Sequence, residues 1–129
     1  MKELTIVEKD RVGLLADVSG ALGGKKVNID SLSVEVTPQK TAILRILTNA
    51  YIKAKRVLAK AGFKVMDTDV LVVRLPNKPG ALAAMSRALA DEGINIENIH
   101  LLNNEKTAGI FAIKINKYGL AREVLRKYL

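Results

Sequence analysis

The sequence contains no cysteine and no tryptophan, and its single histidine is His100. Without cysteine, the chain has no disulfide framework, no thiolate metal site and no cysteine nucleophile, and it suits a reducing compartment. Its Asp and Glu residues are scattered, with no pair at metal or acid-base spacing. No phosphate-binding glycine pattern such as GxGxxG is present. The sequence therefore predicts no catalytic residue, no metal ion, no cofactor and no enzymatic activity.

Long apolar runs are also missing. No segment approaches the length that crosses a bilayer, and residues 2–7 open directly into a strand pattern instead of a basic and apolar leader. With 129 residues, of which 49% are hydrophobic and 26% are charged, the composition is that of a globular protein. These features predict a cytoplasmic protein with no membrane partner.

What the chain does contain is an internal repeat. Shifted by 67 positions, residues 10–15 (DRVGLL) align with residues 77–82 (NKPGAL) without a gap. The register continues as far as residues 57–58, which align with 124–125. A duplication of this kind indicates one supersecondary unit used twice. We therefore expect two domains, residues 1–68 and 69–129, with related versions of one site.

The elements of the unit follow from hydrophobic periodicity. In the first copy, residues 4–7 predict a strand, and the period then changes to that of an amphipathic helix ending near residues 23–24. The buried stripe of this helix is expected from apolar residues spaced three and four apart in both copies: Leu15, Val18 and Leu22, and Leu82, Met85 and Leu89.

Two further strands are predicted at residues 29–36 and 42–47, joined by a turn. A second helix should begin at Asn49, a residue type whose side chain caps helix N-termini, and residues 63–66 predict a fourth strand. The order β-α-β-β-α-β is the ferredoxin-like arrangement. We therefore expect an α+β fold in which two helices cover one face of an antiparallel sheet in each unit.

The second copy stops at Leu129, which aligns with Gly62, so the second unit should lack its last strand. In a ferredoxin-like sheet that strand lies at an edge, beside the first strand. Residues 70–75 are therefore expected to leave backbone donors and acceptors open. We expect exchange between copies or another chain to cover this edge.

Two recurring features are candidates for a binding site. Gly13 and Gly80 occupy the turn from the first strand into the first helix, where helix amides and the helix dipole favour a carboxylate. Asn28 and Asn95 start the second strand, and their amides offer donors and an acceptor to the carboxylate and ammonium groups of an amino acid. Both features also have a purely structural interpretation, since Gly and Asn are common in turns.

The succession of strand, residues 77–82, helix, residues 93–96 and strand resembles the ACT domain, a family of small regulatory modules that bind amino acids. Residues 10–15 are similar to the variant of that family with Asp-Arg before the turn. The resemblance covers nearly the whole chain as a tandem pair. It implies an effector site between two domains, made from the turn of one domain and the Asn-Ile segment or the facing helix of the other.

The resemblance implies these ligand-binding residues: Asp10, Arg11, Val12, Gly13, Leu14, Asn28, Ile29, Asn77, Lys78, Pro79, Gly80, Ala81, Asn95 and Ile96. Val12 stands where the family often has proline, so the two turns are unequal. Leu75 stands where serine-sensing members carry a histidine, which argues against serine as the effector.

The sequence thus predicts a non-catalytic sensor that binds a small amino acid or related metabolite, forms a homodimer and regulates by allosteric pairing. One alternative is a regulatory subunit of a separate amino-acid biosynthetic enzyme, which would need the same pocket. Another is an RNA-binding protein, because RNA-recognition domains share this element order and the net charge is +8. Aromatic residues make up only 4% of the chain, too few for a base-stacking sheet, so a nucleic-acid partner is not expected.

Overall fold

The structure is a computed structural model that describes all residues from 1 to 129. The chain divides into two compact units. The first unit comprises Lys2–Thr68, and the second comprises Met1 together with Asp69–Leu129.

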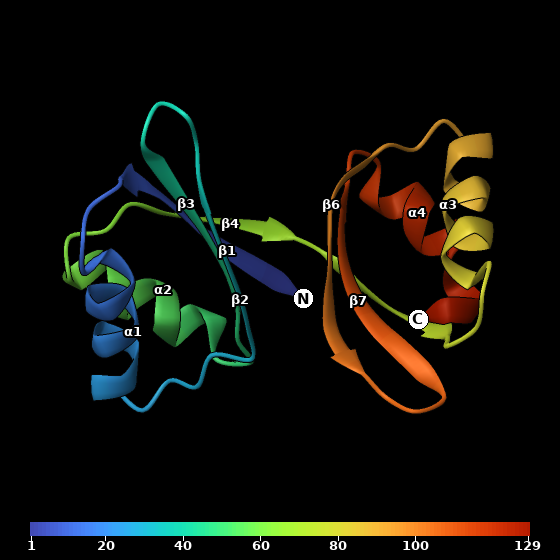
Figure 1. Ribbon diagram of the computed structural model, residues 1–129. Coiled ribbons are helices and arrows are strands. Elements are labelled where there is room, and N and C mark those ends of the chain that lie inside the picture. The colour runs from blue at the N-terminus through green and yellow to red at the C-terminus, as the bar shows by residue number, and fades with distance from the viewer. The chain divides into compact units, whose positions relative to one another are not determined.

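The first unit has the complete ferredoxin-like set of elements: β1 (Lys2–Lys9), α1 (Leu14–Gly24), β2 (Ser31–Val36), β3 (Thr41–Leu47), α2 (Tyr51–Lys60) and β4 (Val65–Asp69). Its sheet has the order β2-β3-β1-β4, and β3 runs antiparallel to both β1 and β2. Helices α1 and α2 cover one face of this sheet (Figure 1).

Strand alternation explains which side chains form the core of the first unit. Leu4 and Ile6 of β1 face the helices, and they are fully buried. Ala42, Leu44 and Ile46 of β3 share that face, because period-two alternation places every second residue on one side of the sheet. Each large apolar side chain buried in this way contributes about 1.5–3 kcal/mol.

The second unit repeats the order without a fourth strand: β5 (Leu71–Pro76), α3 (Ala81–Asp91), β6 (Ile96–Asn104), β7 (Ala108–Ile115), α4 (Tyr118–Val124) and the short 3-10 helix η1 (Arg126–Tyr128). Its sheet has the order β5-β7-β6, again with both helices on one face (Figure 1). None of the four α-helices is long and apolar enough to span a membrane. The predicted α+β fold, with a second unit lacking its last strand, is confirmed.

Strand β5 has β7 on one side and no strand on the other, as expected for an open edge. The expectation was wrong for Val70, because its backbone N–H donates to Met1 O at 2.9 Å. Helix η1 lies next to β5, and in Figure 1 the C-terminus is drawn beside the yellow-green arrow of this strand.

The predicted buried stripe of the first helix was partly wrong. Leu15 and Leu82 are 41% and 46% exposed, whereas Leu14 is buried. Helix α1 begins at Leu14, so the residues facing the sheet follow at spacings of four, and Leu15 is turned to the side. In the second unit, Met85 and Leu89 are buried as predicted.

Two other local predictions also needed correction. Asn49 does not cap α2: the N-cap residue is Ala50, whose backbone N–H donates to Thr48 Oγ1 at 3.2 Å. The backbone N–H of Asn49 donates instead to Asp30 Oδ2 at 3.0 Å, which ties it to the start of β2. The fourth strand begins at Val65, because Phe63 still belongs to the turn after α2, where its N–H donates to Leu58 O at 3.0 Å.

Candidate functional site

The two strand-to-helix turns have the same backbone geometry. Gly13 has φ 87° and Gly80 has φ 85°, and each is the N-cap residue of the following helix, α1 or α3. The carbonyl of each glycine accepts the N–H four residues later at 2.9 Å, from Asp17 and from Ala84. A side chain in this left-handed region costs about 1–2 kcal/mol, so the turn itself requires glycine.

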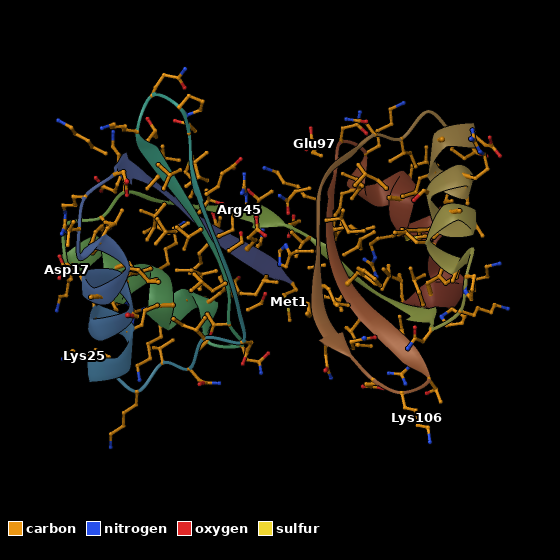
Figure 2. The ribbon with its side chains drawn as sticks, in the orientation of Figure 1. Met1, Asp17, Lys25, Arg45, Glu97 and Lys106 are labelled. Atoms are coloured by element: carbon orange, nitrogen blue, oxygen red, sulfur yellow. The ribbon has the colours of Figure 1, made fainter.

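Each turn is tied to the hairpin between the second and third strands of its unit. Asp10 N–H donates to Lys40 O at 2.9 Å, and at the equivalent position Asn77 N–H donates to Thr107 O at 3.0 Å. The Asn77 side chain adds hydrogen bonds to two more carbonyls of this hairpin, those of Glu105 and Lys106, both at 3.4 Å. Figure 2 shows Lys106 at the tip of this hairpin. The strand-to-helix turn is therefore held against the hairpin tip.

A pocket of about 350 Å³ lies beside the first turn, and we call it the first-turn pocket. Asp10, Arg11 and Gly13 form its polar rim. Its apolar part comes from the start of α1 and the helix-side residues of β2 and β3: Leu14, Leu15, Ala16, Val34, Ala42 and Leu44. The pocket therefore combines backbone amides at a helix start with an apolar floor.

A narrower pocket of about 160 Å³, the second-turn pocket, lies beside the second turn. Seven of its lining residues are the repeat equivalents of first-turn pocket residues: Asn77, Lys78, Ala81, Leu82, Leu101, Gly109 and Phe111. The duplication has therefore preserved a pocket as well as a turn.

Phe111 and Leu101 narrow the second-turn pocket, although Ala81 and Gly109 are smaller than their equivalents Leu14 and Ala42. Phe111 replaces Leu44, and Leu101 replaces Val34. Both side chains reach over Gly109: a Cβ at Gly109 would lie 2.9 Å from Phe111 Cε2 and 3.6 Å from Leu101 Cδ1. The larger side chains fill space that stays open in the first unit.

The predicted turn residues are distributed unevenly around these pockets. Asp10, Arg11, Gly13 and Leu14 line the first-turn pocket, and Asn77, Lys78 and Ala81 line the second-turn pocket. Val12 lines neither, because its side chain is fully exposed at 101%. Pro79 and Gly80 do not line the second-turn pocket.

Sequence reasoning missed the apolar floor. The signal was available, since strand alternation places Val34, Ala42 and Leu44 on one face and the repeat places their equivalents likewise. Leu15 and Leu82 were assigned to the core, whereas both line a pocket.

The Asn-Ile segments lie at the other end of each sheet. The turn follows Lys9, which pairs with Thr41, whereas Asn28 precedes Ser31, which pairs with Leu47 at the opposite end of β3. Asn28 is exposed, and its Nδ2 donates to Asp30 Oδ1 at 3.3 Å. No single unit therefore brings Asn28 and Ile29 to its own turn, and Asn95 and Ile96 occupy the equivalent position in the second unit.

The turns differ in charge. Arg11 donates to Asp17 Oδ2 at 2.6 Å on the surface of α1, where Figure 2 labels Asp17. In the second unit, Lys78 replaces Arg11 and Ala84 replaces Asp17, so this carboxylate is missing and Lys78 makes no ion pair.

His100 is half-buried on β6. Its Nδ1 lies 3.3 Å from Asn98 Oδ1, and it lines neither pocket.

A family model described as the ACT domain matches residues 4–62 and 70–112, which include both turns. The chain belongs to the ACT domain family. The ACT match covers two segments, so the resemblance to a tandem pair is confirmed. No match was found among curated proteins.

Solved structures show the same fold. A protein from Bacteroides thetaiotaomicron is 29% identical with a TM-score of 0.89, covering 98% of this chain and 86% of that protein. The regulatory subunit of aspartate kinase from Thermus thermophilus, in ligand-free form, is 22% identical with a TM-score of 0.68, covering 97% and 88%. A structure of aspartokinase alpha and beta subunits is 22% identical with a TM-score of 0.67, covering 98% and 90%.

Proposed function

We propose that the protein is a non-catalytic sensor that binds a small amino acid or a related metabolite and acts by allosteric pairing. Residues 1–68 and 69–129 serve as its two ACT-type domains, and it works in the cytoplasm as a homodimer. The observation that carries the proposal is that a left-handed glycine turn with a pocket beside it occurs in both repeats.

The ligand carboxylate binds at the start of α1 or α3, where the first helical amides have no partner within the helix and the helix dipole favours a negative charge. In each unit the turn and the Asn-Ile segment lie at opposite ends of the sheet, so the second half of the site comes from a facing domain. Asn28 and Ile29, or Asn95 and Ile96, of that domain meet the ligand at the turn formed by residues 10–14 or 77–81. A ligand held this way stabilises one arrangement of domains over another by its differential affinity.

The first turn is the stronger candidate for the working site. Its pocket has about 350 Å³ against about 160 Å³ for the second-turn pocket, whose lining does not include Gly80. Leu15, Val34 and Leu44 supply an apolar floor, which suits an amino acid with an apolar side chain.

The homodimer rests on the exposed edge of β2. Leu32, Val34 and Val36 point to the helix side of the sheet, yet they are 38%, 47% and 50% exposed. An open strand edge with three exposed apolar side chains favours pairing with another chain.

A second candidate function is that of a subunit regulating a separate enzyme of amino-acid metabolism. The Thermus thermophilus protein of the same fold is described as such a subunit, for aspartate kinase. This candidate uses the same ligand site and adds a surface for the enzyme.

The test is thermal unfolding of the full chain with each of the twenty amino acids in excess. A ligand at about 100 times its dissociation constant adds roughly 2.7 kcal/mol to the stability of the native state, so an effector should raise the midpoint clearly. We expect Val34→Phe, which fills the first-turn pocket, to abolish the rise, and the matched Leu101→Phe to retain it. The proposal fails if no amino acid shifts the midpoint.

A further inference from the structure

A third cavity, of about 740 Å³, opens at the end of β5, and we call it the β5-edge cavity. Arg74, Pro76 and Ala108 line it from the sheet, and Lys127 and Tyr128 line it from η1. The start of α3 supplies Gly80, Ala81 and Ala84. The cavity is thus built around the strand edge that has no neighbour in the second unit.

The charged residues that line this cavity are all cationic. Three cationic residues line it, Arg74, Lys78 and Lys127, and no acidic residue does. Arg74 donates to Glu105 Oε2 at 2.7 Å, while Lys78 and Lys127 make no ion pair. Lys78 Nζ therefore stays available to a ligand, and Lys127 Nζ lies 5.0 Å from the centroid of the Tyr128 ring.

The equivalent positions of the first unit show how the cavity arises. There, β4 lies beside β1, and Asp17 pairs with Arg11. In the second unit the strand is missing, Ala84 replaces Asp17, and Ala81 replaces the bulkier Leu14. In addition, Arg74 stands at the equivalent position of Val7, and Tyr128 at that of Ala61. At the positions that line the cavity, the second unit has thus lost one acid and gained Arg74 and the Tyr128 ring, while Pro76 and Thr107 replace Lys9 and Lys40.

We propose that the β5-edge cavity binds a phosphorylated small metabolite of nucleotide size. Its volume lies in the range of pockets for small-molecule ligands and exceeds the needs of one amino acid. Lys78 and Lys127 contact the phosphate groups, since lysine binds phosphate as a point charge. Pro76, Ala84 and the ring of Tyr128 offer apolar surface to the remainder of the ligand.

This site goes beyond the proposed amino-acid sensor, because its charged residue on η1 and its open strand edge have no part in the turn pockets. It does share Pro76, Lys78 and Ala81 with the second-turn pocket. A ligand in the cavity is therefore placed to influence the second turn.

The test is calorimetric titration of the full chain with ATP as the probe, at low and at moderate salt. We expect saturable binding that weakens as salt rises, and no binding of adenosine, which lacks phosphate. Ala84→Asp restores the carboxylate of the first unit beside Lys78 and should weaken ATP about tenfold or more, as should Lys127→Ala. The matched control is Lys60→Ala, the repeat equivalent of Lys127, which should bind ATP as the unmodified chain does.

Three results would overturn the site: no ATP binding, equal loss of affinity in Lys60→Ala, or citrate binding as tightly as ATP. Absence of ATP binding would mean that the cavity does not bind a nucleotide. Equal loss in Lys60→Ala would mean that ATP binds only through diffuse charge attraction. Citrate binding as tightly as ATP would mean that the site does not select phosphate. The amino-acid response of Ala84→Asp is measured in parallel. A retained response with lost ATP binding separates this site from the sensor site, so that either proposal can fail alone.

Discussion

The ring of Phe111 lies directly over Gly109, two residues earlier on β7. A Cβ added at Gly109 would come within 2.9 Å of Phe111 Cε2 and 3.4 Å of Cζ. In the first unit, the equivalent residues are Ala42 and Leu44. Glycine and the large ring are therefore complementary, and together they narrow the second-turn pocket.

Gly109→Ala should destabilise the protein by about 1 kcal/mol, because the new methyl group forces the Phe111 ring to move. In a Phe111→Leu background the same substitution reproduces the first unit and should be neutral or stabilising. Urea unfolding of the two single variants and the double variant gives the coupling energy, which we expect at about 1–2 kcal/mol. Additive effects would show that the ring and the glycine are independent.

Gly13→Ala should cost about 1–2 kcal/mol of stability, because Gly13 has φ 87° and alanine is strained there. Gly13→Asn should cost less, since asparagine tolerates this conformation better. The control is Gly20→Ala in the exposed interior of α1, where a Cβ meets no atom within 4 Å. That substitution should stabilise by about 0.5–1 kcal/mol. Equal effects at the two glycines in denaturant unfolding would contradict the role assigned to the turn.

The element order could be predicted from the sequence because the repeat supplies each periodic pattern twice. Which residues of the first helix face the sheet could not be predicted. Leu14 and Leu15 are adjacent leucines, and the choice between them depends on where the left-handed glycine starts the helix. Asn49 failed as a cap because its backbone bonds to Asp30, a contact between segments far apart in the sequence.

The candidate site also has features that the sequence predicts and features that it does not. The glycine turns followed from residue type and repeat position. The difference in pocket volume depends on the direction taken by the Phe111 and Leu101 side chains, which no local pattern specifies. The β5-edge cavity depends on an absent strand and on two alanines that are unremarkable by themselves, Ala81 and Ala84.

Asp67 should titrate below the usual range of an aspartate. Lys55 Nζ donates to Asp67 Oδ1 at 3.2 Å, and this hydrogen bond lowers the pKa of Asp67. Since the folded pKa is depressed, the stabilisation by this pair is present above the unfolded pKa and is lost as the pH falls through the folded pKa. NMR titration should show the Asp67 pKa rising towards its ordinary value in Lys55→Met and unchanged in Lys53→Met. An unchanged value in Lys55→Met would remove the hydrogen bond as the cause.

The edge of β2 is a better pairing surface than the equivalent edge of β6, and this predicts which variant breaks the proposed homodimer. Strand β2 pairs with β3 in an uninterrupted register, whereas β6 has shifts between Ile96 and Asn98 and between Leu101 and Asn103. Irregular strands present a poorer template for pairing, and so do polar edges.

Val36→Lys should therefore turn the dimer into a monomer in sedimentation experiments, because a charge on an edge strand opposes pairing with another chain. Val36 is 50% exposed and lines none of the three cavities, so the fold of each unit should not change in the monomer. The matched control is Asn103→Lys, at the equivalent position of β6, which should remain a dimer. A dimer that persists in Val36→Lys but dissociates in Asn103→Lys would place the pairing surface on the second unit.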